Sequence, residues 1–266
     1  MNTDTLVEFA RALVQRPSLS CREEAVAERV RGEMKAVGFD AVTLDENGSV
    51  IGVIQGSEDG RTILLDAHTD TVDVVSPVPW DRDPFSGDID DGVLHGRGSA
   101  DMKGALAAMV HGAADVDRAR IKGRVVVSAS VMEEVLEGVA LRAVMEAFPP
   151  EFVVIGEATN LNLARGGRGR AEIHLETTGI PTHSSAPHLG RNAGPDMLKL
   201  VEALETLELP EHPLMCPAVL ALKEISSAPF PANSVIPSIC RTTYDRLLLP
   251  GESYGYVLGA VGEKAE

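Results

Sequence analysis

Residue types that bind divalent metal ions recur in four separate segments of this sequence. The segments are His68-Thr69-Asp70, the loop Gly96–Gly104 with Asp101 near its centre, Glu133-Glu134 and Gly156-Glu157. Imidazole nitrogen and carboxylate oxygen bind Zn²⁺ at about 2.0–2.2 Å, and one carboxylate can bridge two ions that activate a water between them. The series could therefore build a two-metal hydrolytic site.

Each of the first two segments also has a purely structural explanation. His68 and Asp70 would point the same way on a strand, so Asp70 could orient the imidazole, although this spacing is more often a solvated strand end. Asp101 could cap the helix that follows it, which is compatible with metal bridging. The glycine-rich loop lacks the spacing of a phosphate-binding loop, and its acidic residue would repel phosphate, which argues against a nucleotide site.

The two glutamate segments each follow an apolar run. Glu133 and Glu134 come after Val125–Val131, and Glu157 comes after Phe152–Gly156. Adjacent carboxylates at a strand end can take different roles, one as a metal ligand and the other as a general base. Isolated glutamate pairs are usually surface charge, but four strand ends that each deliver a ligand-type residue are hard to ascribe to solvation.

The elements that must position these residues alternate between strands and helices. Expected strands are Thr62–Ala67, Arg124–Val131 and Phe152–Ile155, and the stripe Met102, Ala105, Leu106, Met109, Val110 and Ala113 predicts a helix. This alternation favours an α/β layer fold with a mainly parallel sheet, whose ligand-bearing loops lie at the C-terminal ends of the strands.

Turn and cap signals organise the residues before the first of these strands. A helix from about Asp4 is expected to stop before Pro17. Ser20 and Glu23 have the spacing of a capping box for a second helix that ends at Gly38. Asn47-Gly48 predicts a hairpin turn.

The pattern changes near residue 164. An alternating strand over Ala171–Thr178, a helix through Glu208, and strands at Ala218–Ser226 and Ile239–Leu248 predict a second, smaller α+β unit. The sequence therefore predicts an α/β domain over residues 1–163 and an α+β domain over residues 164–266.

Composition excludes several classes of protein. The formal net charge of −16 argues against nucleic acid as a partner. Because the start of the chain is acidic and no apolar run is long enough to span a bilayer, we expect a cytoplasmic protein without membrane contact. The cysteines Cys21, Cys216 and Cys240 have no paired spacing, so neither a disulfide framework nor a thiolate metal site is expected.

Taken together, the motifs resemble those of the M20 family of zinc-dependent metallopeptidases and amidohydrolases, along essentially the whole chain, including the segment Trp80–Gly87. The family includes acetylornithine deacetylase, succinyl-diaminopimelate desuccinylase, aminoacylase and carboxypeptidase types. The resemblance implies that His68, Asp101 and Glu157 bind one zinc, with Asp101 as the bridging carboxylate and Glu134 on a second zinc. It further implies that Asp70 orients His68, and that Glu133 is the general base that passes a proton to the leaving amine.

The second unit resembles the family's lid or dimerisation domain. His183 begins a segment that matches the family's histidine motif, which implies a homodimer in which His183 stabilises the oxyanion in the partner subunit's site. Asn233 and Arg246 match residues that contact substrate, and a guanidinium is well suited to a carboxylate. On residue type alone, His183 could be an ordinary loop histidine and Arg246 a solvated charge.

The sequence also departs from the family pattern. Family members return from the lid to the catalytic domain and supply a final histidine to the second zinc. The remaining histidines, His95, His111, His174, His188 and His212, lie in other motifs or in none. We therefore expect a C-terminal truncation, with an incomplete catalytic domain and a second zinc site that lacks this ligand.

The sequence predicts a zinc-dependent hydrolase that cleaves an amide or peptide C–N bond in a small carboxylate-bearing substrate. Whether it is an N-acyl amino acid deacylase or a peptidase stays open. The alternative is a non-catalytic remnant that acts as a binding module. Two zincs per chain would favour the enzyme, and one or none would favour the remnant.

Overall fold

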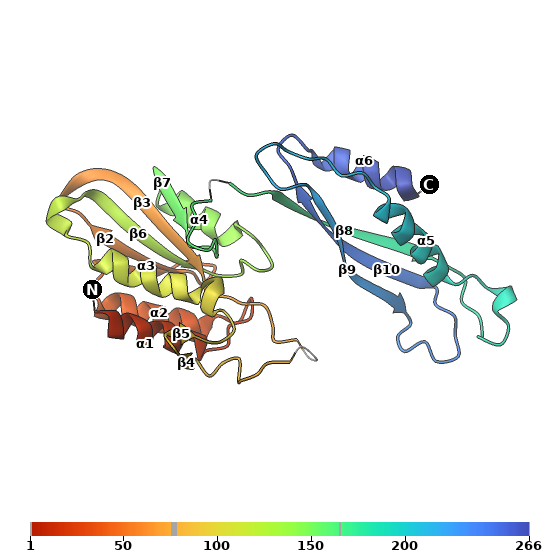
Figure 1. Cartoon of the computed structure of the whole chain (residues 1–266), viewed down its shortest axis with the longest axis horizontal. Coiled ribbons are helices and arrows are strands. Elements are labelled where there is room, and N and C mark those ends of the chain that lie inside the picture. Colours follow the sequence, from red (N-terminus) through yellow and green to blue (C-terminus); the bar gives the residue numbers. More distant parts are fainter. Residues whose placement is uncertain (1, 76–78, 165, 266) are drawn as a thin grey trace. The chain divides into compact units, whose positions relative to one another are not determined.

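The computed structural model describes residues 2–75, 79–164 and 166–265. The chain divides into two units, Met1–Leu163 and Ala164–Glu266, each with its own sheet and helices (Figure 1). The boundary falls where the sequence pattern changes from longer alternating segments to the strand-rich second half.

Unit 1 is built on a five-stranded sheet in the order β1-β2-β6-β3-β7. The strands are β1 Ala41–Leu44, β2 Val50–Gln55, β3 Glu58–His68, β6 Lys122–Ser130 and β7 Phe152–Ile155. The three neighbours β6, β3 and β7 run parallel, while β1 and β2 form an antiparallel hairpin that extends the sheet. The carboxyl ends of the parallel strands therefore meet at one edge, as the α/β prediction with a mainly parallel sheet requires.

Helices cover both faces of this sheet (Figure 1). The helices α1 Thr3–Val14, α2 Glu24–Ala36 and α3 Gly104–Ala114 pack on one face through the main core, which includes Phe9, Val30 and Leu106. The helix α4 Val139–Ala147 packs on the other face, where Val144 contacts a cluster with Leu64 and Val126. Because strand side chains alternate, Leu64, Asp66 and His68 of β3 all face the α4 side.

Short elements complete unit 1. They are the two-residue strands β4 Ile89–Asp90 and β5 Val93–Leu94, the 3-10 turn Arg118–Arg120, and a turn over Ser99–Lys103 that leads into α3. Within that last turn the backbone leaves helical geometry at Asp101 and Met102. Asp101 is thereby separated from the regular part of α3.

Unit 2 is a three-stranded antiparallel sheet in the order β8-β10-β9, with helices packed on one face. Its elements are β8 Gly169–Thr178, the 3-10 turn Pro187–Leu189, α5 Ala193–Glu205, β9 Val219–Ala228, β10 Ile239–Leu248 and α6 Tyr254–Ala265. Ile173, Tyr244 and Val257 form the centre of the core between sheet and helices.

Most predicted elements are present, and two strands have the predicted bounds, Phe152–Ile155 and Ile239–Leu248. The hairpin at Asn47-Gly48 joins β1 to β2, and Gly48 adopts a φ of 101°, which favours glycine. The capping box is wrong. The N-cap position of α2 is Glu23, and its side chain makes no capping hydrogen bond. The hydroxyl of Ser20 donates to Asp70 instead.

Within the described residues, no helix combines the length and the apolar character that crossing a membrane would require.

Candidate metal centre

His68 is the buried centre of the ligand-type residues. It ends β3, is 2% exposed, and directs Nε2 toward three carboxylates: Asp101 Oδ1 at 3.1 Å, Glu157 Oε1 at 3.8 Å and Glu133 Oε2 at 3.9 Å. Nδ1 lies 2.9 Å from the main-chain oxygen of Asp70, which can only accept, so Nδ1 is the donor. In the neutral ring the lone pair is therefore on Nε2, the atom that faces the carboxylates.

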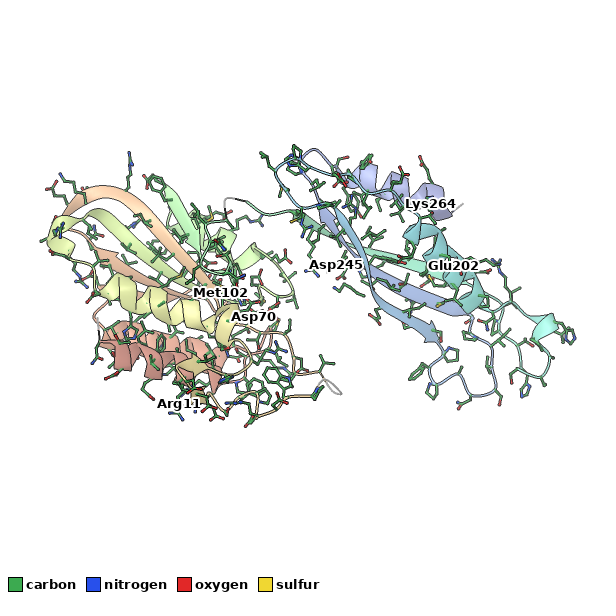
Figure 2. All side chains as sticks on the ribbon, in the orientation of Figure 1. Arg11, Asp70, Met102, Glu202, Asp245 and Lys264 are labelled. Carbon is green, nitrogen blue, oxygen red and sulfur yellow. The ribbon has the colours of Figure 1, made fainter. Side chains whose placement is uncertain are left out.

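Asp70 ties two of the predicted segments together. Its fully buried carboxylate accepts hydrogen bonds from the main-chain N–H groups of Glu133 and Glu134, at 3.0 and 3.1 Å, and from the hydroxyl of Ser20 at 2.6 Å. Burial alone would raise the pKa of Asp70, but these bonds and His68 hold that pKa below its usual range. Asp70 thus fixes the loop that carries both glutamates as well as the histidine. Figure 2 labels Asp70 and Met102 in unit 1.

Asp101 is held in place by the two residues that follow it, Met102 and Lys103. Met102 is buried, and its sulfur accepts the main-chain N–H of His68 at 3.2 Å. Lys103 is also buried, and its ammonium donates to the main-chain oxygens of Leu13 and Arg16 at the end of α1. These contacts anchor the turn to the end of β3 and to the end of α1, so Asp101 is placed against His68 by packing that the sequence motif did not reveal.

Two residues missed by sequence reasoning support the same loops. Ser20 bonds Asp70, and the buried Glu23 accepts the main-chain N–H of Met132 at 3.0 Å. Both lie between α1 and α2 and had been interpreted as a helix cap. No local signal distinguishes these roles, because their partners lie 50 and 109 residues away in the sequence.

The carboxylates gather with little positive charge to balance them. Within the described part of the chain, His68 is the one basic side chain within 4.0 Å of Asp101, Glu133 or Glu157. Burial raises the pKa of Glu133 to about 7, with Glu157 and Glu134 adding to the rise and His68 opposing it. Burial and neighbouring carboxylates also raise the pKa of Glu134 and of Glu157.

The histidine responds in the opposite sense. Burial alone would lower the pKa of His68, but Asp70, Glu133 and Asp101 raise it to about 10. A single proton on one ring thus partly offsets several negative charges. A divalent cation would offset more of them, and borderline nitrogen with hard oxygen donors is the donor set of zinc and similar ions.

The candidate ligand atoms form two groups, and His68 belongs to both. Within each group all ligand atoms lie within 4.8 Å of one another. One group joins His68 to Asp101 and Glu134, and the other joins it to Glu133 and Glu157. The neighbouring glutamates are therefore separated into different groups. Asp101 also helps to raise the pKa of Glu157, so all four segments meet. The residues fit a divalent cation by donor type, by proximity and by their excess negative charge.

A small cavity of about 110 Å³ adjoins these residues, with His68, Glu133 and Glu157 among its lining. Asp66, which the sequence analysis did not single out, also lines it and is bonded to Ser128 and Ser130 of β6. Burial raises the pKa of Asp66, with the serine hydroxyls opposing the rise.

In unit 2, His183 and Asn233 lie on adjacent segments. His183 pairs with Val235 in an isolated antiparallel bridge, and the N–H of Ser184 donates to the oxygen of Ser234, the residue after Asn233, at 2.8 Å. Arg246 is not with them. It is 3% exposed, and its guanidinium pairs with the carboxylate of Glu252.

A first prediction concerns the metal-free protein. Since the pKa of Glu133 is raised to about 7, ionising this group costs stability as the pH rises from its ordinary value, near 4.5, through 7. Glu133→Gln should therefore become progressively more stable than the wild type across this range. The measurement is the melting temperature of chelator-treated protein at a series of pH values.

The matched control for this experiment is Glu146→Gln, which removes an exposed carboxylate on α4. A difference between Glu133→Gln and the wild type that stays constant with pH, or that reverses sign, would contradict the electrostatic account of the site.

Comparison with known families gives a consistent match. The model of peptidase family M20/M25/M40 matches residues 64–240. YgeY of Escherichia coli strain K12, a protein without a described activity, is 34% identical over 257 residues, covering 94% of this chain and 62% of that protein. Succinyl-diaminopimelate desuccinylase 2 of Ruegeria sp. strain TM1040 is 30% identical over 251 residues, covering 89% of this chain and 63% of the relative. The chain thus spans somewhat less than two thirds of the length of these curated relatives.

Solved structures share the fold. The M20 family metallo-carboxypeptidase Sso-CP2 of Sulfolobus solfataricus aligns with 99% of this chain and 75% of its own, with a TM-score of 0.73 at 17% identity. The dipeptidase Dug1p of Saccharomyces cerevisiae aligns with 99% of this chain and 73% of its own, with a TM-score of 0.75 at 15% identity.

Proposed function

Because the chain belongs to peptidase family M20/M25/M40, we propose that it is part of a zinc-dependent hydrolase that cleaves an amide or peptide C–N bond of a small carboxylate-bearing substrate. The observation that carries the proposal is the meeting of His68 with carboxylates from three other segments. Structural ion pairs would explain one such contact. They do not explain an excess of negative charge around the nitrogen of a single buried histidine.

As the family resemblance implies, we assign His68, Asp101 and Glu157 to a first ion, and Asp101 with Glu134 to a second. The two groups of neighbouring ligand atoms divide differently, because they place Glu157 with Glu133. A divalent cation bound there would polarise a scissile carbonyl and lower the pKa of a water. Asp70 would hold the imidazole with Nε2 as the ligand atom, in keeping with the 2.9 Å contact between Nδ1 and its main-chain oxygen.

Glu133 is the proposed general base. Its carboxylate would take a proton from water and then return it to the leaving amine. In the metal-free site burial raises the pKa of this group to about 7. Its main-chain N–H is fixed by Asp70, which keeps the carboxylate beside His68. A general base has to lie beside the reacting water, and it does not have to be a metal ligand.

For unit 2 we propose the role of a lid that also forms a homodimer. His183 would donate a hydrogen bond to the oxyanion in the partner subunit's site, and Asn233 would contact the substrate; the pairing of their two segments supports a joint role. Arg246 would first have to leave Glu252, with which it is paired inside the unit. Breaking a buried ion pair is costly, so this residue is the weaker candidate for binding a substrate carboxylate.

The choice between deacylase and peptidase rests on the relatives. A desuccinylase is 30% identical to this chain, whereas the dipeptidase Dug1p shares only the fold at 15% identity. We therefore place N-acyl amino acids, in which an amide joins an acyl group to a carboxylate-bearing amine, ahead of dipeptides.

The test of this function is metal-dependent hydrolysis by the native gene product. Removal of metal with a chelator should abolish amine release from N-acyl amino acids or dipeptides, and zinc should restore it. His68→Ala should not be restored, because the one nitrogen ligand is lost. His174→Ala, which removes an exposed histidine of unit 2, is the control.

Zinc titration of residues 1–266 gives a second readout of the same assignment. Because His68 is assigned to the first ion, the second ion is left with Asp101 and Glu134, and it should bind at least roughly a hundredfold more weakly. Chelator-resistant hydrolysis would contradict the proposal. Absence of hydrolysis by the zinc-loaded native gene product would favour the non-catalytic binding module.

A further inference from the structure

The ring of His183 is held in the opposite tautomer to that of His68. The main-chain N–H of Ser185 donates to Nδ1 of His183 at 3.2 Å, and the hydroxyl of Ser185 lies 2.7 Å from the same nitrogen. A main-chain N–H can only donate, so Nδ1 must be the lone-pair atom. In the neutral ring the proton is then on Nε2.

The two histidines present different groups at Nε2, a lone pair at His68 and an N–H donor at His183, and these suit a cation and an anionic oxygen respectively. At His68 the main-chain oxygen of Asp70 accepts a hydrogen bond from the Nδ1–H group, which leaves a lone pair on Nε2 for a cation. At His183 two donors converge on Nδ1, which leaves a hydrogen-bond donor on Nε2. A donor of this kind recognises an anionic oxygen, either a carboxylate or the oxyanion of a tetrahedral intermediate.

The main chain around His183 is already fixed by other contacts. Thr182 accepts from the N–H of Ile236 at 3.0 Å, Ser184 donates to Ser234 at 2.8 Å, and the oxygen of His183 accepts from Ala186 at 2.9 Å. The exposed imidazole could still rotate on this anchored segment. Among the residues that the structure describes, Ser185 is the one whose side chain bonds to the ring, so its hydroxyl restrains the torsion that the main chain leaves open.

We propose that Ser185 is a positioning residue, which holds His183 with the proton on Nε2 and so prepares it to donate to an anionic oxygen. The proposal rests on the role of His183 in the proposed function. The competing explanation is that Ser185 only shapes the turn. The two differ in whether loss of the hydroxyl changes the ring of His183 or the fold of the loop.

The direct test is the tautomer, read from the ¹⁵N chemical shifts of the imidazole nitrogens at a pH where histidine is neutral. His183→Asn identifies the signal among the seven histidines of the chain. In the wild type, Nδ1 should be unprotonated and Nε2 protonated. Ser185→Ala should lower this tautomer ratio roughly fivefold, as expected for loss of one neutral hydrogen bond, and Ser185→Thr should restore it.

The matched control is Ser184→Ala, because Ser184 acts through its main-chain N–H. Its tautomer ratio should equal that of the wild type. A proton on Nδ1 in the wild type, or equal ratios in Ser185→Ala and Ser184→Ala, would overturn the proposal.

Kinetics of the native gene product test whether Ser185 acts through His183. Ser185→Ala should lower kcat about fivefold with KM unchanged, and should have no further effect in a His183→Ala background. An equal effect in both backgrounds would overturn the positioning role. If His183→Ala itself leaves the rate unchanged, the proposed role of His183 fails, while the chemical shifts still decide whether Ser185 sets the tautomer.

Discussion

Replacement of Glu133 by glutamine is expected to lower kcat by roughly a thousandfold and to leave the bound metal in place, since a general base typically contributes 10²–10⁴-fold. Glutamine keeps the shape and the main-chain bond to Asp70 but cannot take up a proton. The measurements are kcat and the metal content of the purified variant.

The adjacent residue provides the control for this prediction. Glu134→Gln changes the same chemical group one position along the chain, but it removes a proposed ligand, so it should lower metal content as well as rate. If Glu133→Gln loses metal to the same extent as Glu134→Gln, Glu133 is a ligand and not the base. A near wild-type rate in Glu133→Gln would remove it from the mechanism.

Replacement of His183 by alanine is expected to lower kcat by roughly a hundredfold to a thousandfold, the usual contribution of one oxyanion donor, with little change in metal content. The physical reason is the Nε2 proton that the contact with Ser185 leaves available. His188→Ala, in the turn that follows in the same loop, is the control and should keep its activity.

Mixed dimers locate the action of this histidine. Subunits with His183→Ala combined with subunits carrying Glu133→Gln should regain part of the activity if His183 serves the partner's site. Verified mixed dimers without recovery would place His183 in its own subunit's site, or outside the mechanism.

The sequence was sufficient for the elements whose cause is local. The run Phe152–Ile155 and the alternation over Ile239–Leu248 predict β7 and β10 with their observed bounds. The parallel-sheet prediction also explains why ligand-type residues after three strands come together, since parallel strands end at one edge.

Contacts between distant segments could not be predicted in the same way. Ser20 and Glu23 matched a local capping pattern, but their observed partners are Asp70 and Met132, and no periodicity reports such partners. Arg246 illustrates the same limit at the second unit. Its position in a motif indicated a substrate contact, while its pairing with Glu252 depends on how the chain turns after β10.

The hydrogen bonds of Asp70 have a consequence for the order in which the chain folds. Ser20, Glu133 and Glu134 reach Asp70 across 50 to 64 residues of intervening chain, so each bond closes a long loop whose entropy must be lost first. A cation bound by the proposed ligands His68, Asp101 and Glu157 would act as a reversible cross-link between these distant segments, as a set of disulfides would. Ion uptake in unit 1 would then report completed assembly of the α/β layers, and ion release would mark their first opening.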